Sequence, residues 1–304
     1  MRWESLDWRR DLYGGVPSGS GLNVGLKCRL CKGDVGLWAD RGDVALFFCG
    51  KCQFISGEPR ELLSAEERYH GYYHTPLPAA PIARYRQWLK KAEALIGCGH
   101  VLEIGAGSGA FVQAALERGW KVDANEVSES ALEMLRRTEA TVCSGDLTAA
   151  RYPDSQFDFV VSLEVIEHLP APRDLVREMW RVTRPGGLLL LTTPNFNGIS
   201  RRYLGIRWRV IDPEHLGYIT PSTQSRLLRD VGYKSIWVKS RSLDVLSWRS
   251  GGDPARTTQF DPHASARLRE AVETSRHLRL AKDLVNAALQ ITGFGDSLLA
   301  WARR

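Results

Sequence analysis

The stretch HVLEIGAGSGAF, residues 100–111, is the part of the sequence that decides the fold. A short apolar run leads into a turn that contains Gly105, Gly107 and Gly109, and a helix-forming segment follows at once. Glycine lets the backbone approach a ligand closely, and the first turn of a helix offers N–H groups to bind it. The same residues also fit the dinucleotide pattern G-x-G-x-x-A, so the turn predicts a nucleotide site without selecting its ligand.

Strand-like and helix-like segments alternate beyond this turn. The apolar, strand-like runs lie at residues 120–126, 140–146, 157–164 and 185–195. Helical patterns separate several of them, for example at 128–137 and 172–182. This alternation is typical of a parallel, doubly wound α/β sheet, in which ligands bind at the carboxyl ends of the strands.

Three acids stand at the ends of the first three strands: Glu103, Glu126 and Asp146. Glu103 precedes the glycine turn and could accept hydrogen bonds from an ammonium group. Glu126 is placed to bind both hydroxyls of a ribose, and Asp146 to reach an adenine amine. Because a carboxylate beside the turn would repel a pyrophosphate, a cationic amino-acid sulfonium is the better ligand.

Several segments, taken as an ordered set, resemble the class I S-adenosylmethionine-dependent methyltransferases. They are VLEIGAGSG (101–109), Glu126, SGDL (144–147), FDFVVSLEVIEHL (157–169) and RVTRPGGLLLLTTPN (181–195). The resemblance covers the chain from about residue 80 to about residue 240. It implies an enzyme with a Rossmann-like, seven-stranded sheet that binds S-adenosylmethionine, with Leu147 and Leu163 beside the cofactor.

The end of the chain extends this resemblance. YKSIWVKS (233–240) is expected as the sixth strand, and GDSLLAWARR (295–304) as an antiparallel seventh strand. A helical insertion is expected before that last strand, at about 262–290, because apolar residues recur there at roughly helical spacing. The insertion could cover the active site or form a homodimer interface, and the sequence favours neither.

The chain is expected to divide into three parts. Residues 1–63 would form an N-terminal segment with a zinc ribbon at 26–56, and residues 64–84 a linker or lid rich in tyrosine and proline. Residues 85–304 would form the methyltransferase domain.

The front of the chain is similar to bacterial methyltransferases associated with sugar, polysaccharide or secondary-metabolite pathways. In that group the tyrosine-rich linker lies over the cofactor. The resemblance therefore makes Tyr69, Tyr72 and Tyr73 candidate lid residues and assigns Tyr73 to the cofactor site. The alternative is that these tyrosines pack between the ribbon and the main domain.

Four cysteines occur as two C-x-x-C pairs, Cys28 with Cys31 and Cys49 with Cys52. This spacing is the pattern of a zinc ribbon. Four thiolates leave no open position on tetrahedral zinc, so the site is expected to be structural. A segment this short cannot bury enough core alone, and metal binding would supply its folding energy.

Candidate catalytic residues follow the strand at 157–164. Glu164, Glu167 and His168 share one face if a helical turn comes next, and the later segment DPEHLGYIT (212–220) contributes His215 and Tyr218. Either imidazole could take the proton of an alcohol, since histidine titrates near neutral pH. Carboxylates and imidazoles together could instead hold a divalent metal such as Mg²⁺.

Two further resemblances bear on this choice. The spacing E-x-x-E-H with a distant histidine is similar to the metal site of small-RNA 3′-terminal 2′-O-methyltransferases and ubiquinone-pathway O-methyltransferases. It implies Glu164, Glu167, His168 and His215 as ligands. The element Glu214-His215-x-x-Tyr218 resembles the acid–base groups of sugar C-methyltransferases with an N-terminal zinc module, whose long C-terminal domain has no counterpart in these 304 residues.

The composition limits the kinds of partner that the protein is expected to bind. The net charge is +6, from 41 basic and 35 acidic residues, which suits an anionic ligand and is too mild to indicate nucleic acid. No apolar run is long enough to span a bilayer, and the N-terminus lacks the apolar core of a signal peptide, so a cytoplasmic protein is expected. A local cluster could bind the phosphates of a nucleotide-linked sugar or simply be solvated: Arg201, Arg202, Arg207 and Arg209.

These observations predict O-methylation of a hydroxyl on a sugar or another polar small metabolite, assisted by a base or a metal. Sugar C-methylation and RNA methylation remain alternatives. A non-catalytic module that organises partner enzymes is a third, although such a scaffold would not need to keep the complete cofactor motif.

Overall fold

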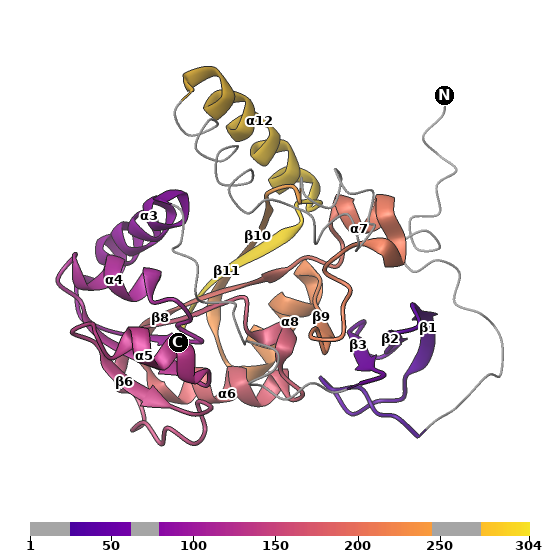
Figure 1. Ribbon diagram of the computed structural model, residues 1–304, viewed down its shortest axis with the longest axis horizontal. Coiled ribbons are helices and arrows are strands. Elements are labelled where there is room, and N and C mark those ends of the chain that lie inside the picture. The colour runs from indigo at the N-terminus through magenta and orange to yellow at the C-terminus, as the bar shows by residue number, and fades with distance from the viewer. Residues whose placement is uncertain (1–24, 62–78, 245–274) are drawn as a thin grey trace.

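A computed structural model of the protein describes residues 25–61, 79–244 and 275–304. At its centre lies a seven-stranded sheet with the order β10-β11-β8-β7-β4-β5-β6 (Figure 1). Its strands are β4 (His100–Ile104), β5 (Lys121–Glu126), β6 (Thr141–Ser144), β7 (Phe157–Leu163), β8 (Thr183–Pro194), β10 (Lys234–Arg241) and β11 (Ser297–Arg303). Strand β11 is antiparallel to both neighbours and the other pairings are parallel. The predicted doubly wound sheet with an antiparallel last strand is confirmed.

Helices cover both faces of this sheet. They are α3 (Ala79–Ile96), α4 (Ala110–Leu116), α5 (Glu129–Leu135), α6 (Pro172–Val182) and α8 (Pro221–Val231). Helix α7 (Ile199–Leu204) instead packs with ribbon residues, and the short 3₁₀ turns are η2 (Ile166–His168) and η3 (Gly205–Arg207). Successive side chains of β7 enter opposite core layers: Val160 packs with α6 and α8, and Val161 with α3 and α4. A strand buried on both faces explains why residues 157–163 are mostly apolar, with Asp158 and Ser162 as the polar exceptions.

Local sequence determines where helix α8 begins and ends. Thr220 precedes the helix and its hydroxyl accepts a hydrogen bond from the Thr223 N–H, while Pro221 occupies the first turn. Gly232 ends the helix in the left-handed conformation that glycine adopts without strain. Because Thr220 fixes the start of the helix, the segment just before it, which contains His215, ends at a fixed position.

The cysteine ribbon, residues 25–61, forms a second, smaller sheet. Its strands β1 (Gly36–Asp40), β2 (Val44–Phe48) and β3 (Ile55–Pro59) are antiparallel. The fourth strand, β9 (Gly217–Tyr218), comes from the main domain and pairs with β3. The ribbon sheet is therefore completed by a segment some 160 positions later in the chain, which local sequence patterns did not indicate.

Helix α3 begins at Ala79, inside the 64–84 segment that was expected to be a linker. Proline is tolerated in the first turn of a helix, and Pro81 lies there. A proline-rich stretch therefore resembles a linker in sequence even where a helix starts. The candidate lid residues Tyr69, Tyr72 and Tyr73 lie outside the described residues.

The helical insertion before the last strand is represented by α12 (Arg276–Thr292), which projects from the β10–β11 edge of the sheet (Figure 1). The first part of the expected insertion, up to residue 274, lies outside the described residues. Leu289 packs inward, whereas Leu280, Leu284 and Ile291 are exposed. Among the described helices, none combines the length and the apolar character required to cross a membrane.

Candidate functional site

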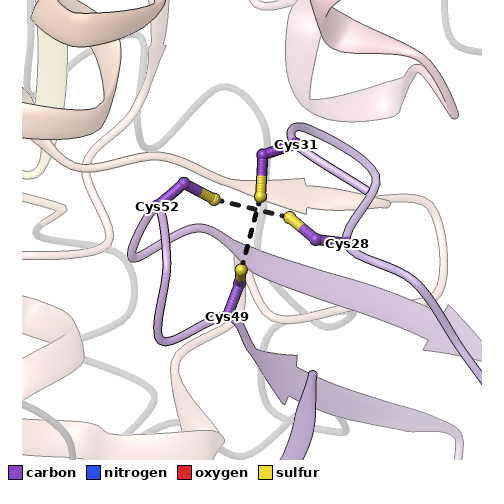
Figure 2. A group of neighbouring side chains, drawn as sticks. All are labelled: Cys28, Cys31, Cys49 and Cys52. Atoms are coloured by element: carbon purple, nitrogen blue, oxygen red, sulfur yellow. Dashed lines mark hydrogen bonds between the residues drawn. The ribbon is translucent and has the colours of Figure 1, made fainter. Parts of the chain in front are cut away.

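The four ribbon cysteines converge on one point (Figure 2). All four sulfur atoms lie within 4.8 Å of one another, with 3.5 Å between Cys28 and Cys52 and 3.5 Å between Cys31 and Cys49. Tetrahedral zinc with Zn–S bonds of about 2.3 Å would place its sulfurs about 3.8 Å apart. The hydrogen bond with Cys52 lowers the pKa of Cys28 to about 5. This donor set fits zinc and leaves it no open position.

The glycine turn adopts a conformation that requires glycine. Gly105, Gly107 and Gly109 all have positive φ, at 69°, 50° and 76°. A Cβ on Gly105 would overlap Cγ2 of Val165, the residue that follows Glu164. The turn therefore lies directly against the carboxyl end of β7, where the candidate catalytic residues begin.

The two acids that flank the turn have different surroundings. Glu103 is 3% exposed, and its Oε2 has no hydrogen-bond partner among the described residues. Burial, and then the charge of Glu126, raise the pKa of Glu103 well above its usual range. Glu126 instead accepts hydrogen bonds from the N–H groups of Gly107, Val127 and Ser128 at 2.7 to 2.9 Å. A buried acceptor without a partner fits the ammonium group of the expected S-adenosylmethionine.

The remaining expected cofactor residues line the same edge of the sheet. Asp146 follows β6, is exposed, and accepts a hydrogen bond from the Ala149 N–H at 2.7 Å. Leu147 is buried beside it, and Leu163 is the last residue of β7. These positions agree with the end-of-strand arrangement on which their assignment depended.

Glu164 has an unusual backbone. Its φ is +57°, although it is not a glycine, and its N–H donates to the Thr192 carbonyl at 3.1 Å. Strained residues of this kind concentrate at functional sites. The conformation turns the chain from β7 into η2, as shown by the His168 N–H bonding to the Val165 carbonyl at 3.0 Å. The turn after the strand is a 3₁₀ turn over Ile166–His168, which contains Glu167 and His168, and Glu164 lies outside it.

Glu164 and Glu167 form an asymmetric carboxyl pair. Glu164 is exposed, whereas Glu167 is 2% exposed and accepts a hydrogen bond from the Thr193 hydroxyl at 3.0 Å. Burial, and then the charge of Glu164, raise the pKa of Glu167 well above its usual range. Desolvation by the surrounding protein raises the pKa of Glu164 as well, so both members of the pair favour the protonated form, Glu167 more strongly.

Both candidate histidines have one ring nitrogen committed to a backbone carbonyl. Nδ1 of His168 lies 3.2 Å from the Glu214 oxygen, and Nδ1 of His215 lies 2.5 Å from the Val210 oxygen. A carbonyl only accepts, so each Nδ1 carries a proton, and in the neutral imidazole Nε2 carries the lone pair. The two rings are 4.6 Å apart between centroids. Burial lowers the pKa of His215 to about 4, which makes it a weak base at neutral pH.

The segment that carries His215 is held by Asp212, a residue that the sequence analysis did not single out. One Asp212 carboxylate oxygen accepts from the N–H groups of Glu214 and His215, at 2.8 and 3.1 Å. The Tyr218 hydroxyl donates to the Asp212 carbonyl at 3.3 Å. Burial raises the pKa of Tyr218, so this phenol stays protonated. The D-P dipeptide at 212–213, a common turn signal, was the available clue.

Three of the four predicted metal ligands gather in space. Ligand atoms of Glu167, His168 and His215 lie within 4.8 Å of one another, and Glu164 is not part of that group. Metal-bound histidines usually donate their other ring N–H to a carbonyl or carboxylate, as both histidines do here. One carboxylate and two imidazoles are a donor set that a divalent ion accepts.

Two residues at the same edge were missed by sequence reasoning. Arg241 ends β10, and its guanidinium lies 5.2 Å from the ring centroid of Trp88. Burial, and then nearby Arg84, lower the pKa of Arg241 to about 10. Burial also raises the pKa of Tyr85 to about 12, and the charges of Glu103 and Glu164 contribute. Single arginines and tyrosines outside a motif carry no sequence signal of such a position.

The arginine cluster at 201–209 is largely engaged within the protein. Arg201 is 4% exposed and its Nε donates to the Phe196 carbonyl at 2.8 Å, so it is not the solvated residue that the surface hypothesis expected. Arg202 bonds Asn197 at 3.0 Å and Arg209 pairs with Asp244 at 2.9 Å. These contacts order the loop around α7.

This chain is similar in sequence to several known proteins. A family model described as "Methyltransferase domain" matches residues 72–237. The chain is 24% identical over 197 residues to the ubiquinone biosynthesis O-methyltransferase of Leptothrix cholodnii, covering 58% of this chain and 83% of that protein. It is 29% identical over 172 residues to the malonyl-[acyl-carrier protein] O-methyltransferase of Serratia marcescens, covering 50% and 67%.

A solved structure shows the same fold. It is a SAM-dependent methyltransferase from Archaeoglobus fulgidus, matched with a TM-score of 0.52 at 17% identity over 79% of this chain and all of the other.

Proposed function

The chain belongs to the methyltransferase domain family and is an S-adenosylmethionine-dependent methyltransferase, and we propose that it methylates a hydroxyl oxygen of a sugar or another small polar metabolite. The observation that carries this proposal is the contact of Gly105 with Val165. It puts the cofactor turn beside the segment that presents Glu164 and His168. Both curated relatives described above are named O-methyltransferases.

The cofactor would be held by residues of the glycine turn and by the acids beside it. S-adenosylmethionine supplies an electrophilic methyl group when it is bound. Glu103 would accept from its ammonium group, Glu126 would bind the ribose hydroxyls, and Asp146 with Leu147 would border the adenine. The cysteine ribbon would hold structural zinc.

His168 is the proposed general base. Its Nδ1–H donates to the Glu214 carbonyl, so Nε2 has the lone pair that accepts a proton from the acceptor hydroxyl. The proton would move from the hydroxyl oxygen to Nε2 as that oxygen forms its bond to the methyl carbon, and the methyl–sulfur bond of the donor would break to leave S-adenosylhomocysteine. His215, which is neutral at working pH, orients the site, and the exposed carboxyl group of Glu164 would stabilise the imidazolium that forms.

A divalent metal is the second candidate for activating the hydroxyl. The observation in its favour is the group formed by Glu167, His168 and His215, with both Nδ1 atoms committed to backbone carbonyls. In that case the metal would lower the pKa of the hydroxyl, and the proton on Glu167 would be lost on metal binding.

Two arginines near Glu164 favour an acceptor that carries an anionic group. Arg84 and Arg241 lie near Glu164 and the end of β8, since Arg241 is in register with Ser297 and Ser297 with Pro194. Arginine binds phosphate and carboxylate through paired N–H groups. A nucleotide-linked sugar fits this description.

The engagement of Tyr218 disfavours C-methylation. Its hydroxyl donates to the Asp212 carbonyl, and its raised pKa keeps it protonated. An acid–base role at an enolate would require that hydroxyl to face the acceptor. The contact with Asp212 instead supports a structural role.

The test is methyl transfer from labelled S-adenosylmethionine to a panel of hydroxyl acceptors, including nucleotide-linked sugars, with bulk RNA as a comparison. Replacement of a general base typically lowers kcat by about 10²- to 10⁴-fold, and we expect this for His168→Ala with cofactor affinity unchanged. The exposed His277 provides the matched control, and His277→Ala should behave as wild type.

Two outcomes would reject the proposal: a product methylated on carbon or on RNA, or near-normal turnover by both His168→Ala and His215→Ala. Treatment with EDTA, with the ribbon zinc shown to remain bound, separates the two activation mechanisms. Loss of activity that Mg²⁺ restores would assign the metal, and insensitivity would assign the base.

A further inference from the structure

The ribbon is joined to the candidate active site through backbone hydrogen bonds. Ile55 and Ser56 of β3 are in register with Tyr218 and Gly217 of β9, and the Gly57 N–H donates to the Leu216 carbonyl at 3.0 Å. The Leu216 N–H in turn donates to the carbonyl of Glu167 at 2.8 Å. These two hydrogen bonds connect Gly57 of the ribbon, through Leu216, to Glu167 in the turn η2.

Gly57 is placed where no side chain fits. A Cβ there would overlap the backbone oxygen of His215 and come within 3.1 Å of Cε2 of Tyr218. The φ of Gly57 is not in the left-handed region, so the requirement for glycine comes from space alone. The ribbon backbone thus lies against the backbone of His215 itself.

Arg41, in the loop between β1 and β2, reaches the same segment from the other side. Its guanidinium donates to the Ile211 carbonyl and pairs with Asp43. Only 20% of its side chain is exposed. The hydrogen bond with Asp43 is the main factor that raises the pKa of Arg41, and Tyr218 and Asp212 contribute, which puts this cation beside the residue that orients His215.

Apolar packing makes the contact continuous. One core cluster contains residues of the ribbon and of the segment that leads to His215: Val44, Leu46, Ile55, Phe196, Leu204, Trp208, Ile211 and Tyr218. Since this cluster buries Ile211 and Tyr218, the two ends of the 211–218 segment are both fixed against ribbon residues. Backbone hydrogen bonds, the Arg41 guanidinium and apolar packing therefore all connect the ribbon to this one segment.

We propose that the ribbon is part of the catalytic apparatus, with Arg41 and Gly57 as positioning residues that hold the 211–218 segment, and through it His215 and Glu167, at the methyl-transfer site. The inference rests on the proposed function for the roles of His215 and Glu167. Arg41 acts through Ile211 and Asp212, and Gly57 acts by allowing β3 to approach His215. The ribbon is then expected to affect the rate of transfer more than cofactor binding, since a Cβ at Gly105 would meet Val165 and a Cβ at Gly109 would meet Leu135, which are not ribbon residues.

The experiment compares Arg41→Ala with Arg41→Lys and Arg60→Ala. Arg60 is the matched control, because it is a ribbon arginine that pairs with Asp40 and is 60% exposed. A displacement of about 1 Å in a catalytic group can cost about 100-fold in rate, and we expect kcat of Arg41→Ala to fall by about 10- to 100-fold. The S-adenosylmethionine Kd and the zinc content should stay at wild-type values, and Arg41→Lys should recover part of the rate.

A second pair of variants tests the backbone contact. Gly57→Ala should lower kcat in the same way, whereas Gly36→Ala should not, because a Cβ at Gly36 meets nothing within 4 Å. Both glycines lie in ribbon strands without positive φ, so strain does not distinguish them.

Two measurements do not depend on the acceptor. Hydrogen exchange at the amides of Gly57 and Leu216 should become faster in Arg41→Ala, and imidazole ¹⁵N spectra should show loss of the Nδ1–H tautomer of His215. Unchanged kcat, exchange and tautomer in Arg41→Ala would overturn the inference. If wild type transfers no methyl to hydroxyls while exchange and tautomer still respond, the proposed function fails and the positioning role of the ribbon stands.

Discussion

Glu103 is the residue whose surroundings are least satisfied in the cofactor site. It is buried next to a second acid, Glu126, and one of its oxygens has no partner within the described part of the chain. Its pKa is raised well above the usual range by burial and by the charge of Glu126. An acid in this state opposes folding when it ionises, and a cation that binds to it reverses that penalty.

Glu103→Gln should therefore stabilise the ligand-free protein and weaken cofactor binding. Because the folded pKa is raised, the penalty is absent below the unfolded pKa, grows as pH rises, and is complete above the folded pKa. The variant should melt higher than wild type at neutral pH, by about 2–4 °C per kcal/mol, and equally below about pH 4. Its affinity for S-adenosylmethionine should fall by about 10- to 100-fold, the cost of a charge-assisted hydrogen bond.

Thermal melts across pH and titration calorimetry measure both effects. Glu129→Gln is the control, because Glu129 is exposed and pairs only with Arg136 among the interactions described. Equal melting temperatures at neutral pH, or an unchanged cofactor affinity, would contradict the assignment of Glu103.

At the scale of elements, the glycine turn after β4 and the 3₁₀ turn after β7 form one unit. Gly105 contacts Val165, and the Leu216 N–H ties η2 to the segment before β9. The cofactor and the catalytic groups are therefore positioned relative to each other by two turns at neighbouring strand ends. Neighbouring parallel strands make this possible, because their carboxyl ends meet at one edge of the sheet.

Gly105→Ala should disrupt this unit. An alanine there must adopt positive φ, at a cost of about 1–2 kcal/mol, and its Cβ must also displace Val165. We expect a lower melting temperature and loss of measurable S-adenosylmethionine binding. Gly119→Ala is the matched control, since Gly119 also has positive φ but a Cβ there meets nothing within 4 Å. It should lose stability and keep cofactor affinity; loss of affinity in both variants would argue against the contact.

At the scale of the whole molecule, the ribbon and the main domain share their cores. One cluster of buried residues contains Cys28, Cys49, Cys52 and Phe54 together with Ile219 and residues of β7 and β8. A second joins the ribbon hairpin to Trp208 and Tyr218. Domains with a shared core unfold together rather than as separate units.

We therefore expect one cooperative unfolding transition, whose midpoint falls when zinc is removed. A ligand present at about 1,000 times its Kd stabilises by about 4 kcal/mol, so the midpoint should drop by about 10 °C. Calorimetry with and without a chelator, and on Cys52→Ser, measures this. Two separate transitions, or a main transition that does not respond to chelator, would show that the ribbon folds independently.

Much of the fold and part of the site could be predicted from local patterns. The ordered motifs predicted the doubly wound sheet and its antiparallel last strand, and the glycines at 105, 107 and 109 all have positive φ. The cysteine spacing predicted a four-sulfur cluster, which is present. Each of these depends on residues close in sequence, whose periodicity or spacing is itself the physical signal.

Other features could not be predicted because they depend on residues far apart in the chain. The start of α3 was masked by a proline-rich composition that suits a linker equally well. Arg241 comes to lie beside Trp88 and Arg84 only when β10 has joined the sheet and α3 has packed against it. The raised pKa of Glu167 depends on burial, which no local pattern reports.

The sequence by itself determined the class of sheet, the cofactor turn with its acids, the cysteine cluster and the identity of the methyl donor. Each is indicated by short motifs and by their order and spacing along the chain, and the methyl donor by the resemblance that these motifs carry. The tertiary structure alone decided that β9 completes the ribbon sheet, that Arg41 contacts Ile211 across 170 positions, and which histidine nitrogen carries the proton. Such contacts form only when distant segments pack together. The free energy of that packing comes from many residues of the core, so no single motif indicates it.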